Sequence, residues 1–333
     1  MPALFTHHLF ALTFAKKHIS IFPFLLEKQT LLTLGAQGPD PFFFYGQFPF
    51  RKRLEKEKIV QVGSWLHHQD PAIHLLALVR ETLKIIEKNT SITPILLTYL
   101  LGAISHYVLD RTFHPYVFYR SGFDSNGKLS APYHADHADF EAKLDLALMQ
   151  HFAVKRSGMT PQQTLGVDTI SLSMVSALYH LTYPKFPLTK TSYKDAVEDM
   201  QSVYAFIDDR FGIKKTIWTW FTGKRSVPVG LSHDPSVSTA LQTTILNLDF
   251  HMWKHPASQV ESQQSVIELF DIALSLMDRF IHLIQKGLQG YQVQLSDLEA
   301  LVEGMNYDGH LFTDHMKNFS SMYPSYQGSK TQR

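Results

Sequence analysis

The sequence predicts an all-α protein, a multi-helix bundle. Apolar residues recur at three- and four-residue steps along most of the chain, which is the pattern of amphipathic helices. Strand-like alternation of apolar and polar residues is scarce. Hydrophobic residues make up 44% of the 333 positions and charged residues 18%, so the chain can form a large core. No shift in composition marks a boundary, and we therefore treat residues 1–333 as a single helical domain.

A first amphipathic helix is predicted from about Leu75 to Ile86, with charged residues between the apolar ones. Residues 89–91 are polar and end it. Thr93 and Pro94 then fit an N-cap and a first helical position, because proline has no amide hydrogen to lose there.

The helix that begins at Pro94 is predicted to run to about Phe113, since Pro115 disfavours helical geometry at His114. Its apolar run, Ile92 to Leu109, is short for a membrane span and contains Thr, Ser and His. We therefore expect a buried core helix and no transmembrane segment.

More helices are predicted in the second half of the chain, at about 197–211, 241–252 and 260–284. Ser296 and Glu299 fit a capping box for a short helix after them. Clusters of Pro, Gly and Ser predict loops at about 121–132, 184–192 and 222–236. We expect residues 146–322 to form a helical remainder and residues 323–333 to fray.

Charge and cysteine content exclude several classes of protein. The chain has 31 Lys and Arg against 30 Asp and Glu, so it lacks the basic field that counterion release requires, and we expect no stable nucleic-acid complex. It has no cysteine, which excludes disulfide scaffolds, thiol catalysis and Cys-ligated zinc. Residues 1–15 lack an early basic residue and a small-residue cleavage site, so we expect no secretory signal and a cytoplasmic protein.

The 18 histidines are the unusual feature, and several have a spacing that suits metal binding. His106 and Asp110 lie four residues apart on a predicted helix, so both side chains project from one face. His137 and Glu141 repeat this spacing. His114 lies about 12 Å along the axis from His106, at ~1.5 Å per residue, and suits a second ion with Asp110 between the two.

Spacing alone is weak evidence, because a chain with 30 acidic residues gives such pairs nearly by chance. His310 and Asp314 form another pair of this kind, and polar helix faces with hydrogen-bonded histidines give the same pattern. The order of the short motifs that contain these residues is more specific evidence than the spacing.

Four short sequence motifs within residues 1–145 resemble motifs of the bacterial zinc-dependent phospholipase C family. They are FTHHLF at 5–10, GAQGPDPF at 35–42, GAISHYVLDR at 102–111 with His114-Pro115-Tyr116, and HADFE at 137–141. The segment LNLD at 246–249, with Trp253 and Pro256, is also similar to intracellular members. The resemblance implies a helical fold shared with the S1/P1-type nucleases, with a cleft that holds two to three zinc ions.

The resemblance also implies the ligands. The first ion is held by Asp40, His67, His106 and Asp110, and the second by His114, His137 and Glu141. Asp110 bridges to a third ion, which His7 and the backbone of the N-terminal residue complete. The sequence does not separate His7 from His8 or His67 from His68, and Asp136 or His134 is an alternative outer partner of His137.

Imidazole nitrogen with carboxylate oxygen suits zinc, with manganese or iron as alternatives, and suits calcium poorly. Two such ions, about 3.5 to 4 Å apart, activate water and hold the attacking and leaving oxygens of a phosphodiester. We therefore expect a phospholipase C-like hydrolase that acts on a phospholipid or another phosphodiester. Asp40 is the candidate catalytic base, and the alternative is a metal-bound hydroxide that needs no separate base. Phe43 and Tyr45 are candidates for substrate binding, because aromatic faces attract a quaternary ammonium headgroup, although core packing also explains them.

Three alternatives compete with this interpretation. An S1/P1-like nuclease or another phosphodiesterase is compatible with the same scaffold. An HD-type phosphohydrolase would use His233 and Asp234, but the following Pro235 disfavours a helical pair there. A non-catalytic helical protein with a structural metal site is the alternative outside the enzymes. Ferritin-like di-iron chemistry is excluded because repeated Glu-x-x-His motifs are lacking. The headgroup and the oligomeric state are left open.

Overall fold

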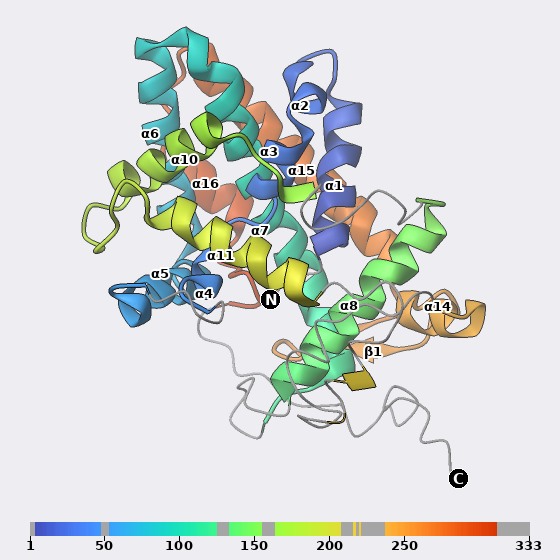
Figure 1. Ribbon diagram of the computed structural model, residues 1–333. Coiled ribbons are helices and arrows are strands. Elements are labelled where there is room, and N and C mark those ends of the chain that lie inside the picture. The colour runs from blue at the N-terminus through green and yellow to red at the C-terminus, as the bar shows by residue number, and fades with distance from the viewer. Residues whose placement is uncertain are drawn as a thin grey trace.

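The computed structural model describes residues 4–47, 53–124, 133–154, 164–207, 216–217, 220 and 237–311. These residues are mostly helical, so the all-α prediction is confirmed (Figure 1). The strands within this part are the antiparallel pair β1 (Trp253–Lys254) and β2 (Glu261–Ser262). The predicted loop at 222–236, the His233-Asp234 pair, Asp314 and the tail 323–333 lie outside the described residues.

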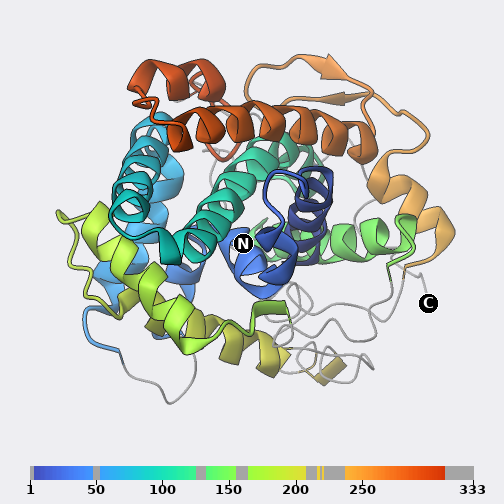
Figure 2. The ribbon, with the colours of Figure 1, turned by 90° about the horizontal axis from the view of Figure 1, so that it is seen from above.

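The helix α7 (Thr93–Ser121) runs through the middle of the fold (Figure 2). It contacts helices from both halves of the chain: α1 (Leu4–Lys17), α3 (Gln29–Gly35), α6 (Pro71–Lys88), α8 (Tyr133–His151) and α15 (Val266–Leu288). Among the described helices, α7 alone has the length and apolar composition to cross a membrane, and 78% of its apolar window is buried inside the protein. The run 92–109 is thus the buried core helix that its sequence predicts.

Contrary to the sequence prediction, α7 does not end at His114. It continues through Pro115 to Ser121, where Gly122 follows. Proline has no amide hydrogen for the carbonyl of Arg111, one turn earlier. The backbone of Gly309 packs against this carbonyl and the proline ring. Because α7 is buried on both sides of Pro115, tertiary packing outweighs the local preference of proline.

The remaining helices flank α7. Figure 1 shows α6 and α10 (Thr169–Thr182) on one side of it, and α8 and α14 (Thr239–Leu246) on the other. The other helices are α2 (Phe24–Glu27), α4 (Pro41–Phe44), α5 (Lys56–His68), η1 (Thr90–Ile92), α11 (Ser192–Ile207) and α16 (Leu295–Val302). The helix predicted at 75–86 is confirmed as part of α6, where Asp70 caps the first turn by accepting from the Ala72 amide.

Several predicted boundaries in the second half are wrong. The helix expected at 241–252 ends at Leu246, because Asn247 adopts a left-handed conformation that ends α14. The helix expected from 260 begins at Val266, where a capping box of Ser265 and Glu268 satisfies its first amides. The capping box of α16 is Gln294 with Asp297, two residues before the predicted pair. The helix expected at 197–211 is α11, which begins at Ser192, and Phe211 lies outside the described residues.

A glycine pair brings the chain before α4 close to α7. At the crossing of α3 and α7, a Cβ on Gly102 would lie 2.6 Å from the Leu32 carbonyl oxygen and 2.7 Å from the Gly35 Cα. Only glycine allows the two backbones to approach this closely. The segment after Gly35, which carries Asp40, therefore lies against His106 of α7.

Candidate metal centre

Three groups of histidines and carboxylates, two of which share His106, lie inside the fold, and we call them together the His/carboxylate cluster. In each group the candidate ligand atoms lie within 4.8 Å of one another. The groups are His7, His106 and Asp110; Asp40, His67 and His106; and His114, His137 and Glu141. The structure thus brings together all eight residues that the family resemblance implied as ligands.

Five parts of the chain deliver these side chains. The helix α7 presents His106, Asp110 and His114 at successive four-residue steps on one face. The helix α8 presents His137 and Glu141 in the same way. The other candidate ligands come from the first turns of α1 (His7), the turn before α4 (Asp40) and the end of α5 (His67).

Asp110 occupies the middle of the cluster. Its Oδ2 lies 3.2 Å from His106 Nε2, and its Oδ1 lies 3.0 Å from His7 Nε2. The same Oδ1 lies 4.0 Å from His114 Nε2. The two oxygens of one carboxylate therefore face different histidines, which is the geometry that a bridging ligand requires.

The two flanks of the cluster each have their own carboxylate. Asp40 Oδ1 lies 3.0 Å from His67 Nε2 and 3.9 Å from His106 Nε2. On the opposite flank, Glu141 Oε1 lies 3.2 Å from His137 Nε2 and 3.6 Å from His114 Nε2. Each flank thus combines one carboxylate with two imidazoles.

Backbone carbonyls set the orientation of three of these imidazoles. His67 Nδ1 donates to the Gly63 carbonyl at 2.7 Å, His106 Nδ1 to Ala36 at 3.1 Å and His114 Nδ1 to Tyr307 at 2.8 Å. A ring that donates from Nδ1 has its other nitrogen free to act as a ligand, as is usual for metal-bound histidines. In all three residues this other nitrogen, Nε2, faces the carboxylates.

The pKa values reflect strong coupling between the buried groups. Burial alone would raise the pKa of Asp110, but His106, His114 and His7 hold it well below its usual value. Burial lowers the pKa of His106 to about 4, so that this ring is neutral at pH 7. Burial would also lower the pKa of His114, but Asp110 and Glu141 raise it to about 10. The carboxylates therefore attract positive charge into the cluster.

Buried atoms of the cluster, among them His7 Nδ1, His106 Nε2 and Asp40 Oδ2, have no hydrogen-bond partner among the described residues. Buried polar atoms are rarely left this way unless an ion or water completes them. Imidazole nitrogens with carboxylate oxygens, in a chain that has no cysteine, form a donor set that suits zinc, manganese or iron. The cluster therefore fits a divalent transition metal, and its geometry leaves the identity of the metal open.

The structure distinguishes the neighbouring histidines that the sequence did not. His8 points away from the cluster to Thr33, with 2.7 Å between Nδ1 and Oγ1, and burial lowers its pKa to about 4. His68 is exposed and bonds to the Ser64 carbonyl. The three groups therefore contain His7 and His67, and His134 lies outside them.

The two predicted substrate-binding residues lie in different surroundings. Phe43 borders the cluster, with 5.1 Å between its ring centroid and that of His67. Tyr45 packs under Arg53, whose guanidinium carbon lies 5.8 Å from the ring centroid. Arg53 in turn pairs with Asp195 and Asp199 of α11. A role in substrate binding stays a prediction for both residues.

Sequence reasoning missed Tyr307, which follows α16 and supports the cluster. Its carbonyl accepts from His114, and its ring centroid lies 4.9 Å from that of His67 and 5.6 Å from that of His106. Tyr307 has no metal-ligating side chain and lies far from the motifs in sequence, so no local signal identifies it.

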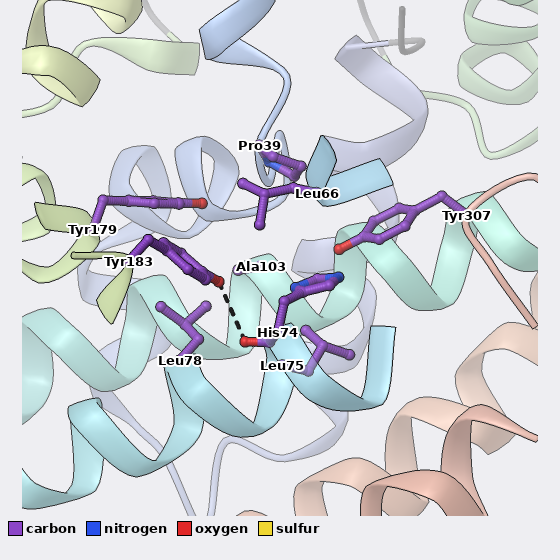
Figure 3. Close-up of a pocket in the computed structure, with 9 residues that line it drawn as sticks. All are labelled: Pro39, Leu66, His74, Leu75, Leu78, Ala103, Tyr179, Tyr183 and Tyr307. Carbon is purple, nitrogen blue, oxygen red and sulfur yellow. Dashed lines mark hydrogen bonds between the residues drawn. The ribbon is translucent and has the colours of Figure 1, made fainter. Parts of the chain in front are cut away.

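A small cavity of about 10 Å³ lies behind the cluster, lined by His74, Tyr307, Pro39 and neighbouring residues (Figure 3). This is about the space of one water molecule. Burial lowers the pKa of His74 to about 3, and its Nε2 has no partner among the described residues. The cavity is too small for an organic substrate.

Fold and site together define a class: an all-α protein with a buried His/carboxylate cluster that can hold divalent metal. Comparisons with protein-family models, with curated proteins and with solved structures each found no match. The resemblance to phospholipase C therefore rests on the short sequence motifs alone.

Proposed function

We propose that the protein is a zinc-dependent phosphodiester hydrolase of the phospholipase C type. The observation that carries this proposal is the position of Asp110, whose two oxygens face His106 on one side and His7 and His114 on the other. A carboxylate in this position is suited to bridge adjacent ions, and adjacent divalent ions are typical of phosphodiester hydrolysis.

The residues of the cluster would form three ion positions. Asp40, His67, His106 and Asp110 would hold the first ion, and His114, His137 and Glu141 the second. His7 with Asp110 would serve a third, whose remaining ligands in the resembling family come from the N-terminal residue, outside the described part of this chain. When bound, zinc would supply a Lewis acid that polarises the phosphoryl oxygens and lowers the pKa of a water nucleophile.

The chain's own groups prepare the site for proton transfer. Burial alone would raise the pKa of Asp40, but His106 and His67 lower it below its usual value, so the carboxylate is ionised at neutral pH. Asp40 Oδ1 faces His67, whereas Oδ2 has no hydrogen-bond partner among the described residues. Oδ2 is therefore the atom that would accept a proton from the attacking water.

A phospholipid is the substrate class that we favour. The formal charge of +1 gives no basic field for a polynucleotide backbone. The aromatic ring of Phe43 beside His67 offers an apolar border to the cluster. Hydrolysis would leave the phosphate on the headgroup and release an alcohol.

The first test is metal content combined with turnover. We expect elemental analysis of the purified protein to find at least two zinc ions per chain. The protein should hydrolyse bis(p-nitrophenyl) phosphate, lose this activity with chelator and regain it with zinc. Zinc that is bound without turnover would instead indicate a structural metal site.

Substrate assays then separate the enzymes. Phosphatidylcholine in mixed micelles should release its phosphorylated headgroup faster than a single-stranded oligonucleotide is cleaved. The reverse order would favour the S1/P1-like nuclease. A protein that binds no zinc and whose unfolding midpoint does not change with chelator would refute the proposal.

A further inference from the structure

A second acidic residue continues the ligand face of α8. His137, Glu141 and Asp145 follow one another at four-residue steps, and all three are buried. The first two belong to the His/carboxylate cluster, whereas Asp145 does not. A carboxylate that is 0% exposed is costly unless hydrogen bonds or charges compensate for its lost hydration.

Both carboxylate oxygens of Asp145 accept hydrogen bonds from the first turn of α1. Its Oδ1 accepts from the Thr6 amide and the Thr6 hydroxyl, both at 2.7 Å, and its Oδ2 accepts from the Phe5 amide at 3.1 Å. The first amides of a helix have no partner within the helix, and a negative charge there is favourable. The first turn of α1 has no acidic residue of its own. Asp145 therefore acts as an N-cap that a different helix supplies.

This cap lies directly before the cluster ligand of α1. His7 follows Thr6, and its Nε2 lies 3.0 Å from Asp110 Oδ1. The next residue, His8, bonds instead to Thr33 of α3, with 2.7 Å between Nδ1 and Oγ1. A rotation of α1 about its axis, or a shift along it, would take His7 away from Asp110. The contacts of Asp145 oppose both movements.

We infer that Asp145 is a positioning residue, which holds His7 against Asp110 by capping α1 from the ligand-bearing face of α8. One rigid helix thereby connects the second ion position, through His137 and Glu141, to the ion position that His7 serves. The inference rests on the proposed metal centre for its effect on zinc, but the capping contact itself can be tested without metal.

The test uses Asp145→Asn in the full chain, with Asp139→Asn as the matched control. Asp139 lies on α8 and pairs with Lys143 of the same helix. Zinc is titrated into chelator-treated protein against a competing indicator. For Asp145→Asn we expect the affinity of one ion position to fall by about 10- to 100-fold, the usual effect of losing an outer partner of a metal ligand, while the other positions keep theirs. Asp139→Asn should bind zinc like the unmodified chain.

Hydrogen exchange supplies the metal-free readout. In chelator-treated protein, the amides of residues 4–17 should exchange faster in Asp145→Asn, with α7 and α8 unchanged. Thr6→Val, which removes the hydroxyl contact alone, should shift exchange in the same direction by less, and it replaces Asp145→Asn if that variant does not fold. Unchanged exchange in α1 together with unchanged zinc binding would overturn the inference. If the unmodified chain binds no zinc but α1 still loosens in Asp145→Asn, the proposed metal centre fails while the cap stands.

Discussion

Asp110 is the residue on which most of the cluster depends, since its carboxylate faces His7, His106 and His114. Replacement of this carboxylate by the neutral amide in Asp110→Asn keeps the shape but removes the negative charge that would bridge two ions. We expect bound zinc to fall by at least one ion per chain and phosphodiesterase kcat/KM to fall by at least about 100-fold, more than the loss of an outer partner usually costs. Elemental analysis and steady-state kinetics measure the two effects. Full zinc content in this variant would show that Asp110 is not a ligand.

The adjacent histidines of α5 allow a matched comparison. His67→Ala removes a ring whose Nε2 lies 3.0 Å from Asp40, whereas His68→Ala removes an exposed ring that bonds to its own helix. We expect His67→Ala to lower zinc affinity and activity by about 100-fold or more, and His68→Ala to change both by less than about twofold. Equal effects of the two substitutions would contradict the assignment.

At the residue scale, the sequence could identify pairs but not choose between neighbours. The four-residue spacing of His106 with Asp110 and of His137 with Glu141 places each pair on one helix face, and the structure has both pairs within the cluster. The choice of His7 over His8 depends on Thr33 and Asp110, which are distant in sequence. Local periodicity contains no information about such partners.

At the element scale, long amphipathic helices were predicted well and their ends were not. The periodicity of α6 and the buried character of the run 92–109 are both properties of a single segment. Where α7 continues past Pro115, it packs against Gly309, from a loop nearly 200 positions later. A rule that considers only the residues next to proline cannot include that contact.

The contact of Gly309 with α7 leads to a stability prediction. A Cβ at position 309 would lie 2.3 Å from the Arg111 carbonyl oxygen and 2.6 Å from the Pro115 ring, and the residue has a φ of 75°. We expect Gly309→Ala to reduce the free energy of unfolding by about 2–4 kcal/mol, from overpacking added to the strain of a positive φ. Urea unfolding followed by circular dichroism measures this loss.

Gly290→Ala is the control, because Gly290 has a φ of 95° but no atom within 4 Å of the added Cβ. Gly290→Ala should reduce the free energy of unfolding by about 1–2 kcal/mol, from the strain of a positive φ alone. Equal losses for the two variants would show that the packing of Gly309 against α7 contributes nothing.

At the scale of the whole molecule, the second half of the chain supports a cluster whose candidate ligands all come from the first half. Tyr99 of α7, Tyr179 of α10 and Tyr193 of α11 bring their hydroxyls together at the Gly38 carbonyl, and Tyr193 donates to it at 3.0 Å. This carbonyl belongs to the turn that ends in Asp40. The sequence motifs lie in residues 1–145, so residues 146–322 had only a general packing role in the sequence prediction, and the structure gives two of these tyrosines a specific contact near the cluster.

Metal removal should reveal how far the fold depends on this arrangement. A metal that binds only the folded state stabilises it by about 2.7 kcal/mol at a free concentration 100 times Kd, and the loss of that amount in a protein of this size lowers Tm by roughly 4 °C. We therefore expect chelator to lower the Tm of the unmodified chain by that amount, and added zinc to restore it, in differential scanning calorimetry. Asp110→Asn should respond to chelator much less, because it has already lost metal. If chelator shifted both proteins equally, the stabilising ions would lie outside the His/carboxylate cluster, and the eight convergent side chains would need a different explanation.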